Sequence, residues 1–264
     1  MERRILITGG SKGIGAAIGD AAARRGWTNL VVGRDEAAMR ALIDRWRARS
    51  PVREHKYLAQ DLIEPSAVER IAKWLDEVGS PDTVVQNAAT GFFGRFAETG
   101  LQKHADTIAL GVRLTVELTH ALLPPLCRLP HGYLAYVGST SGRKPVPYMN
   151  VYSSTKAFLH NFAVALRAEL AGGPPKVLLA IPGAVRTGFP GAAGLPADFT
   201  ASGLPPGVVG EMIVKAIEDG RDGIMPIGSL KERYGGWLQR ILPPTFWASK
   251  MRAFYEPMLR KREP

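Results

Sequence analysis

The sequence contains a single cysteine, Cys127, so no intrachain disulfide can form among its 264 residues. It also lacks any run of about 18 consecutive apolar residues, which is the length that a membrane-spanning helix needs. The chain opens directly into the strand-like residues Ile5, Leu6 and Ile7, with no secretory leader before them. Together these absences predict a protein of the reducing cytoplasm that does not cross a bilayer.

Repeats, low-complexity tracts and linker-like runs of Ser and Gly are missing as well. A chain of this length without a linker fits one large α/β domain better than two small ones. Composition shifts only near Leu230, where Gly and Ala become rare and aromatic and basic residues increase. We therefore expect a catalytic domain over residues 1–229 and, over residues 230–264, an appendage of the same domain.

Acidic residues are fewer than basic ones, and the net charge is +10. A positive charge suits nucleic acid, an anionic membrane surface, or an anionic cofactor or substrate. Nucleic-acid binding would also need aromatic stacking platforms or a recognition helix, whereas cations such as Arg40, Arg45 and Arg49 are scattered over an expected helix. The pattern predicts solvated helix faces and no nucleic-acid partner.

Short apolar runs rich in β-branched residues alternate with longer segments of helical period. This alternation predicts an α/β fold with a doubly wound, seven-stranded parallel sheet and helices on both faces. The expected strands are Arg3–Thr8, Asn29–Val32, Glu54–Ala59, Thr83–Asn87, Gly132–Gly138, Lys176–Ile181 and Gly223–Pro226. In such a sheet the ligand lies beyond the carboxyl ends of the strands, so the loops after strands should carry the chemistry.

A glycine-rich loop follows the first expected strand and leads into a helix. Its cofactor-binding candidates are Gly9, Ser11, Lys12, Gly13, Ile14 and Gly15. Such a loop lets backbone N–H groups approach a pyrophosphate, and the helix dipole favours the negative charge. The spacing is TGxxxGxG, with Ile18 where a third close-packing glycine is expected, and it resembles the short-chain dehydrogenase/reductase family, whose fold is a Rossmann-type sheet.

Arg34 ends the second expected strand, where a dinucleotide fold holds the adenosine ribose. An acidic residue there would bind the 2′-hydroxyl of NAD, whereas Arg pairs bidentately with the 2′-phosphate of NADP. Lys12 adds a second cation near the same phosphate, as in NADP-preferring relatives. Asp35 is expected to cap the next helix. We therefore expect NADP(H) to be the cofactor.

The resemblance implies further cofactor contacts at the ends of later strands. Asp61 and Leu62 are similar to the family's acidic contact with the adenine amino group and its neighbour. The segment from Gln86 to Ala89 is similar to Asn-Asn-Ala-Gly of the family and retains Asn87 and Ala88. The remaining positions implied in this way follow the sixth expected strand, resemble a Pro-Gly turn that packs on the nicotinamide, and are Pro182, Gly183, Val185 and Thr187.

The catalytic candidates are Ser139, Tyr152 and Lys156. Tyr152 and Lys156 are four residues apart, so they share one helical face. The family resemblance implies that both also contact the cofactor. A free phenol has a pKa of about 10, and a cation within about 4 to 6 Å lowers it by about 1 to 3 units. Tyr152 would then exchange a proton with the substrate oxygen while Ser139 holds that oxygen. Ser141 is the rival for the serine role, but the interval to Tyr152 matches the family better for Ser139.

One element of the family pattern is replaced. Many relatives place an Asn in the helix after strand four to hold a proton-relay water, and Gly111 occupies that position here. Glycine is less favourable than alanine in a helix interior by about 1 kcal/mol, so a local kink is expected. Gly111 therefore puts the full proton relay in question.

Two segments are expected to serve the substrate side. Residues 187–206 carry Asp198 as their only acidic residue and are typical of a lid over an apolar pocket, with an ill-ordered surface loop as the alternative. Beyond Leu230, prolines Pro243 and Pro244 divide a segment of interspersed cations and aromatics, so short helices are expected there. We expect this segment to close the pocket, with peripheral membrane contact as the weaker alternative. Its aromatic residues are Tyr234, Trp237, Phe246, Trp247, Phe254 and Tyr255.

These features predict an NADP(H)-dependent oxidoreductase that interconverts a ketone and a secondary alcohol, with a bulky apolar small molecule as its substrate. A non-catalytic NADP(H)-binding sensor is the alternative, suggested by Gly111 and by the altered segment around Asn87. A basic nucleic-acid binder is the least favoured hypothesis. No metal ligand set is predicted, and the resemblance implies a homodimer or homotetramer.

Overall fold

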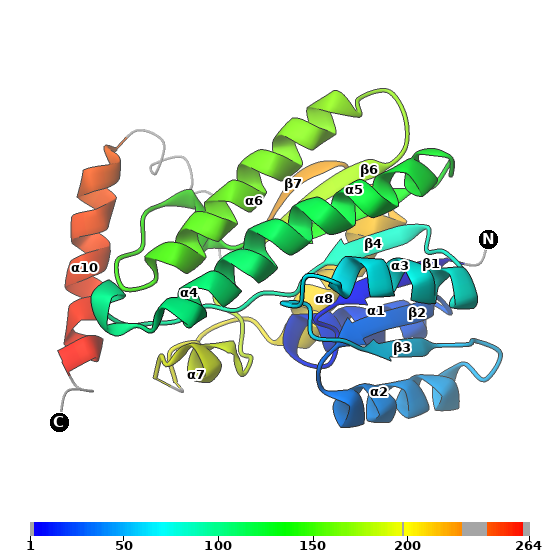
Figure 1. Cartoon of the computed structure of the whole chain (residues 1–264), viewed down its shortest axis with the longest axis horizontal. Helices are drawn as coiled ribbons and strands as arrows, with labels where there is room; N and C mark the ends of the chain where they lie inside the picture. Colours follow the sequence, from blue (N-terminus) through cyan, green and yellow to red (C-terminus); the bar gives the residue numbers. More distant parts are fainter. Residues whose placement is uncertain (1–2, 197, 229–241, 261–264) are drawn as a thin grey trace.

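A computed structural model describes residues 3–196, 198–228 and 242–260 (Figure 1). Within these ranges seven parallel strands form one sheet in the order β3-β2-β1-β4-β5-β6-β7. The strands are β1 Arg4–Thr8, β2 Thr28–Gly33, β3 Lys56–Ala59, β4 Thr83–Gln86, β5 Tyr133–Val137, β6 Lys176–Pro182 and β7 Gly223–Ile227. The predicted doubly wound parallel sheet is confirmed, and each predicted strand overlaps the observed one with its ends within two residues.

Alternate side chains of β1 enter opposite cores, which explains why its apolar run is continuous. Leu6 packs into the core on one face of the sheet, and Ile5 and Ile7 pack into the core on the other. All three side chains are fully buried. In a strand that is covered on both faces, every side chain enters a core, so apolar residues occupy every position rather than alternate ones.

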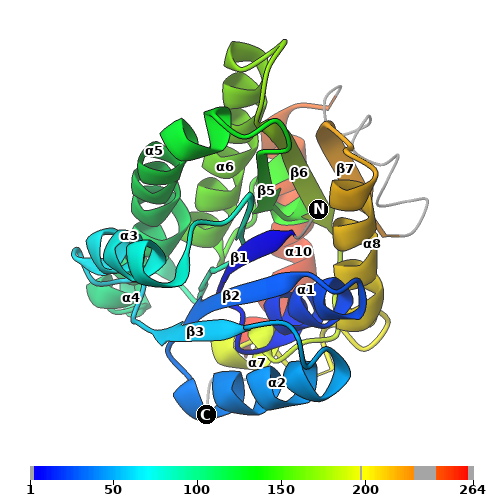
Figure 2. The ribbon, with the colours of Figure 1, turned by 90° about the vertical axis from the view of Figure 1, so that its right-hand side faces the viewer.

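Helices cover both faces of the sheet, with α3, α5 and α6 on one side and α1 and α8 on the other (Figure 2). The helices that frame the sheet are α1 Gly13–Arg24, α2 Glu36–Arg49, α3 Ala67–Val78, α4 Leu101–Ile108, α5 Leu114–Cys127, α6 Asn150–Glu169, α7 Phe189–Ala193 and α8 Pro206–Glu218. Short 3₁₀ turns span Phe96–Glu98 (η1) and Thr140–Arg143 (η3), and a π-helical segment, η2 Ala109–Arg113, joins α4 to α5. Asp35 caps α2 as expected, because its carboxylate accepts the Ala38 N–H.

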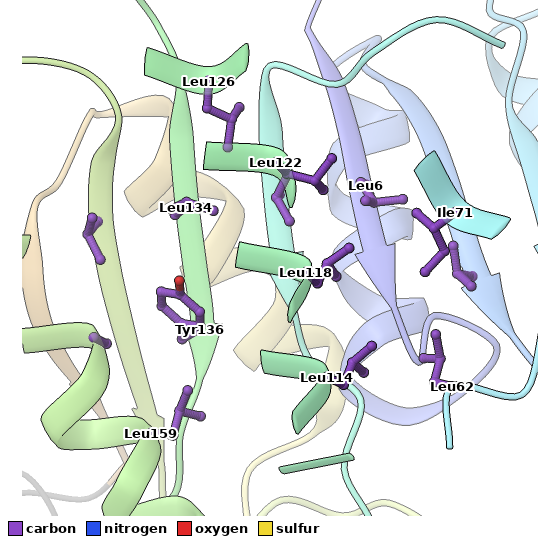
Figure 3. Close-up of a cluster of buried hydrophobic side chains, with 14 of the residues drawn as sticks. Leu6, Leu62, Ile71, Leu114, Leu118, Leu122, Leu126, Leu134, Tyr136 and Leu159 are labelled. Carbon is purple, nitrogen blue, oxygen red and sulfur yellow. The ribbon is translucent and has the colours of Figure 1, made fainter. Parts of the chain in front are cut away.

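The core under α3, α5 and α6 is formed mainly by leucines that meet the sheet (Figure 3). Leu118 on α5 and Leu134 on β5 are fully buried there. Buried polar groups pair with one another in this layer, since the hydroxyl of Tyr136 lies 2.8 Å from Thr119 Oγ1, which also accepts a hydrogen bond from Gln86 Nε2 at 2.8 Å. A buried phenol with its partner satisfied holds α5 against the centre of the sheet, directly behind the strands that carry the active-site loops.

The described part of the C-terminal segment is one helix, α10 Pro244–Arg260, and not the short helices that the prolines predicted. Pro244 is the first residue of this helix, where its missing N–H is not needed. Pro257 lies inside the helix without dividing it. α10 lies at the end of the molecule where α6 begins (Figure 1), and its Tyr255 and Leu259 pack with Val146 and Met149, just before α6. Tyr234 and Trp237 lie outside the described residues, and no described helix has the length and hydropathy of a membrane span.

Candidate active site

The glycine loop is held by contacts that leave no room for side chains. Gly9 and Gly13 have φ values of +64° and +60°, which glycine adopts at no steric cost. A Cβ on Gly15 would lie 2.4 Å from the Gly9 carbonyl oxygen. The amide of Asn87, at the end of β4, donates to the carbonyls of Thr8 and Gly9, each at 3.1 Å. Asn87 thus fixes the loop from the neighbouring strand.

Ala88 and Thr8 complete this junction between β1 and β4. The Thr8 hydroxyl accepts the N–H of Asn87 at 3.0 Å and that of Ala88 at 3.2 Å. A Cβ on Gly9 would lie 2.9 Å from the Ala88 Cα, so the two loops are in backbone contact. Asn87 and Ala88 thus join the end of β4 to the glycine loop after β1, at the centre of the sheet.

The end of β2 brings Arg34 and Asp61 together. Arg34 Nη1 lies 3.6 Å from a carboxylate oxygen of Asp61, and the Arg34 side chain is 67% exposed. Asp61 Oδ1 also accepts the N–H of Ile63 at 3.0 Å, which fixes the carboxylate. Leu62, in contrast, points into the core, so only its backbone faces the loop edge. Lys12 is exposed on the glycine loop beside this region.

The turn after β6 closes the same edge of the sheet. Pro182 ends β6, and the Gly183 N–H donates to the Ile227 carbonyl at 2.9 Å, which holds the turn on β7. The side chain of Val185 is buried in the core between the sheet and α8. Thr187 meets the glycine loop, since a Cβ on Gly13 would lie 3.4 Å from Thr187 Cγ2. The glycine loop and the turn after β6 therefore lie against each other at this edge of the sheet.

Ser139 and Tyr152 lie together at the carboxyl end of β5. The Ser139 hydroxyl acts on the Tyr152 phenol and lowers its pKa. Ser139 Oγ also accepts the Ser141 N–H at 3.1 Å, which caps η3 and fixes the serine. Ser139, rather than its rival Ser141, thus contacts the phenol.

Lys156 lies one turn after Tyr152 on α6 and is 5% exposed. Its ammonium donates to the Val137 carbonyl at 2.8 Å and lies 5.9 Å from the centre of the Tyr152 ring. Burial lowers the pKa of Lys156 to about 8, so the side chain is mostly protonated at neutral pH. The predicted sharing of one helical face by the two residues is observed.

The pKa of Tyr152 differs from the expected direction. Burial raises it to about 12, and this effect outweighs the lowering by Ser139. An electrostatic interaction with Tyr255 on α10 raises it further. A pKa below the usual value was expected from Lys156, but the Lys156 ammonium is bound to the Val137 carbonyl. Among the effects of the protein's own groups on the pKa of Tyr152, desolvation by burial is therefore the largest.

Two glycines position α6: Gly91, which the sequence interpretation did not use, and Gly142, which it used only to choose Ser139 over Ser141. A Cβ on Gly91, in the loop after β4, would lie 2.8 Å from Cδ2 of Tyr152, so this backbone covers the tyrosine ring. A Cβ on Gly142 would lie 2.7 Å from the Lys156 carbonyl, so η3 rests on the α6 backbone. The only sequence signal was indirect, since Gly142 follows Ser139 at a fixed interval.

His160 is a further residue that sequence reasoning missed. It follows Tyr152 and Lys156 at the same four-residue spacing on α6, and this spacing was the signal that could have found it. Its Nε2 accepts the Ser139 N–H at 3.5 Å and lies 2.8 Å from where a Cβ on Gly138 would be. Burial, with a smaller contribution from the charges of Arg143 and Lys156, lowers the pKa of His160 to about 4. The neutral imidazole thus supports the strand end that carries Ser139.

Gly111 lies within the π-helical segment η2, so the expected irregularity in this helix is observed. A Cβ on Gly111 would lie 2.6 Å from Cβ of Thr155, next to Lys156 on α6. The Thr155 hydroxyl is already engaged, because it donates to the Tyr152 carbonyl at 2.8 Å. Glycine at this position lets the helix backbone approach α6, and a larger side chain would separate the two helices.

Aromatic and aliphatic side chains surround Tyr152 on the substrate side. We call this set the aromatic cluster; it comprises Phe93, Val146, Met149, Ala193, Leu195, Tyr255 and Leu259, with Tyr148, Tyr152, Phe189, Phe199, Met251 and Met258 packed against them. The Phe189 and Tyr152 rings have centroids 5.2 Å apart. Tyr148 adopts a positive φ of 66°, an unusual conformation for a bulky residue that often marks functional sites. Residues from the segment 187–206 thus pack in the aromatic cluster, and Phe189 packs on Tyr152.

No group of three or more His, Cys, Asp or Glu side chains suited to a metal ion occurs among the described residues. The carboxyl edge of the sheet instead carries the glycine loop, Arg34, Thr187 and the serine-tyrosine-lysine set. Such an edge suits a dinucleotide with a small substrate at its reactive end.

Comparisons with known proteins agree with this geometry. Residues 3–194 match the family model of the short chain dehydrogenases, so the chain belongs to this family of oxidoreductases. It is 31% identical over 192 residues to sulfoacetaldehyde reductase 2 of Chromohalobacter salexigens, covering 72% of this chain and 75% of that protein. It is 28% identical over 219 residues to ketoacyl reductase HetN of Nostoc sp., covering 82% of this chain and 76% of that protein.

Among solved structures, a short-chain dehydrogenase from Sphingobium yanoikuyae in complex with NADPH is similar to this chain. The TM-score is 0.80 at 25% sequence identity, and the match covers 90% of this chain and 94% of that one. The similarity therefore extends over the whole sheet with its helices.

Proposed function

We propose that this protein reduces ketones to secondary alcohols with NADPH, and catalyses the reverse reaction with NADP⁺, on bulky apolar substrates. The observation that carries the proposal is the grouping of three side chains: Ser139 acts on the Tyr152 phenol, and the buried Lys156 ammonium lies 5.9 Å from the Tyr152 ring centre, one helical turn away. This set lies at the carboxyl edge of the sheet, where ligands bind in doubly wound folds. The aromatic cluster beside Tyr152 supports the apolar character of the substrate.

The cradle formed by the chain fits NADP(H). A Cβ on Gly9, Gly10 or Gly15 would lie less than 3 Å from neighbouring backbone or side-chain atoms, which leaves the glycine loop in the form that admits a pyrophosphate. Arg34 and the exposed Lys12 would bind the 2′-phosphate, and Thr187 would hold the nicotinamide carboxamide. NADPH bound there would supply the hydride for the carbonyl carbon.

The protein's own groups handle the substrate oxygen. Ser139 Oγ donates a hydrogen bond to it, and Tyr152 Oη transfers its proton to it as the alcohol forms. In the reverse direction Tyr152 accepts the hydroxyl proton. Its burial-raised pKa of about 12 keeps the phenol protonated at neutral pH, as reduction requires. Lys156 would bind the nicotinamide ribose and stabilise the phenolate that remains after proton transfer.

The test is a screen of NADPH oxidation over ketones graded in size, with Tyr152→Phe as the diagnostic variant. The substitution removes the transferable proton and should lower kcat by about 10²- to 10⁴-fold while NADPH affinity persists. Near wild-type turnover of Tyr152→Phe on any ketone that the parent reduces would exclude Tyr152 as the acid. A wild-type protein that binds NADPH but reduces no ketone would instead support the sensor hypothesis, which Gly111 motivates.

We also propose that the chain works as a homodimer or homotetramer. Leu101 on α4, Val116 on α5 and Val164 on α6 are exposed aliphatic residues of the helices on one face. Sedimentation velocity at micromolar concentration tests the assembly, and a single monomeric species would contradict it. Peripheral membrane contact through residues 230–264 is the weaker proposal, and absence of binding to anionic liposomes at low salt would exclude it.

A further inference from the structure

Tyr148, in the turn before α6, has a backbone conformation that favours glycine. The Met149 N–H donates to the Val146 carbonyl at 3.2 Å and closes a β-turn over residues 146–149. Tyr148 is the third residue of this turn and has a φ of +66°. Turns with a positive φ there are of type II, which favours proline at the second position, as Pro147 supplies, but glycine or asparagine at the third. Among the residues that the structure describes, Tyr148 is the only non-glycine residue with a positive φ.

The Tyr148 side chain explains why the turn keeps a strained residue. A bulky residue persists in this conformation only where the surrounding structure compensates for the strain. The Tyr148 ring meets the Phe93 ring edge to face, with centroids 6.2 Å apart. The Tyr148 carbonyl accepts the Gly94 N–H at 2.9 Å. A glycine could keep this hydrogen bond without strain but could not contact Phe93, so the ring is the part that glycine cannot replace.

Tyr148 thereby holds residues 91–94, the loop after β4, which contacts the catalytic tyrosine. A Cβ on Gly91 would lie 2.8 Å from Cδ2 of Tyr152, so the backbone at the start of this loop covers the tyrosine ring. The N–H of Phe93, which is 5% exposed, donates to the Ala193 carbonyl at 2.7 Å. The loop is thus fixed between the turn before α6 and the segment 187–206.

We propose that Tyr148 is a positioning residue for Tyr152 and acts through the loop 91–94, a role that rests on the proposed ketone reductase function. The Tyr148 ring holds Phe93, and the loop that carries Phe93 restricts the Tyr152 ring at Gly91. A reacting group displaced by about 1 Å can lose about 100-fold in rate. The strained turn is retained because a glycine would relax it but release the loop.

Tyr148→Gly and Tyr148→Ala form a matched pair, because both remove the ring but only glycine also relieves the strain. Both variants should lower kcat for ketone reduction by NADPH about tenfold, since the loop no longer restricts Tyr152. The Kd for NADPH should stay unchanged. Amide hydrogen exchange over residues 91–95 should be about tenfold faster in both variants, because the loop opens more often.

Thermal denaturation separates this role from a merely structural one. Glycine adopts a positive φ without strain and alanine does not, so Tyr148→Gly should melt about 2 to 4 °C above Tyr148→Ala. The two variants should nevertheless have equally low kcat. A higher kcat in the more stable variant would show that Tyr148 serves stability alone, and it would overturn the proposal. Tyr148→Phe keeps the ring and should restore kcat to within about twofold of wild type.

Three further results would decide against the proposal. Unchanged exchange over residues 91–95 in Tyr148→Gly, or unchanged kcat in an enzyme that reduces ketones, overturns the positioning role and leaves the proposed function standing. A Tyr148→Phe protein as slow as Tyr148→Gly overturns it as well, because the hydroxyl and not the ring would then matter. If wild type reduces no ketone, the proposed function fails and the positioning role fails with it.

Discussion

The cofactor side and the substrate side of this site are built in different ways. On the cofactor side the closest contacts are between backbone segments. Gly9 lies against the backbone of Ala88, and Gly15 lies against the backbone of Gly9. On the substrate side, side chains from distant segments meet one another, as Phe189 meets Tyr152 and Phe93 meets Tyr255. Backbone contacts restrict residue type to glycine or other small residues, whereas side-chain packing accepts many combinations of similar volume. A single added methyl group should therefore disrupt the cofactor side, whereas the substrate side should tolerate substitutions of similar volume.

Gly15→Ala should give the largest effect in this comparison. The new Cβ would lie 2.4 Å from the Gly9 carbonyl oxygen and 2.7 Å from the Asn87 amide nitrogen, so the loop must shift. Overpacking of this kind costs about 1 to 3 kcal/mol, which would weaken NADPH binding by up to about 100-fold.

Titration of NADPH fluorescence measures this loss, and Gly207→Ala is the control because a Cβ there has no atom within 4 Å. Thermal denaturation shows whether both variants are folded. Unaltered NADPH affinity in a folded Gly15→Ala protein would mean that the backbone contact does not limit the cofactor side.

Arg34→Ala should have an intermediate effect, confined to the cofactor that carries a 2′-phosphate. Loss of a charge-assisted hydrogen bond costs about 1.5 to 3 kcal/mol, so the Kd for NADPH should rise at least about tenfold. The Kd for NADH should stay within about twofold, since NADH offers no phosphate to this side chain.

Arg45→Ala is the matched control, because Arg45 is an exposed arginine of α2 that pairs with Asp20 at 2.6 Å. It should leave both dinucleotides unchanged. An equal loss for NADPH and NADH in Arg34→Ala would show that the arginine acts on the loop and not on the phosphate.

The smallest effects on function should come from two histidines with the same lowered pKa of about 4, His55 and His160. His55 is fully buried and accepts the Asn29 N–H, away from the catalytic set, whereas His160 supports Ser139. Below about pH 6.5 the unfolded chain binds protons at these residues and the folded chain does not. The free energy of unfolding should therefore fall as the pH decreases from about 6.5 to 4, by at most about 1.4 kcal/mol per pH unit for each histidine.

Substitution by glutamine separates the two roles. His55→Gln should flatten the pH dependence of urea denaturation and leave kcat unchanged. His160→Gln should flatten it as well but lower kcat by several fold, because Ser139 loses its backbone support. Equal kcat in wild type and His160→Gln across the pH range would show that His160 has a purely structural role.

The pattern of the sequence was sufficient to predict the sheet, the glycine loop and the serine-tyrosine-lysine set. Each of these depends on local periodicity or on short spacings: a strand buried on both faces is apolar at every position, and residues four apart share a helical face. Arg34 was identified in the same way, from its position at the end of a strand.

Other features were decided by the tertiary structure, because they depend on segments far apart in the chain. Gly91 covers Tyr152, and Tyr255 reaches the catalytic set from α10, without any sequence spacing that links them. The pKa of Tyr152 also depended on packing, since burial outweighs the contribution expected from Lys156. Spacing along a helix determines which residues are neighbours, but burial and the partners of each charge arise only when the whole chain is folded.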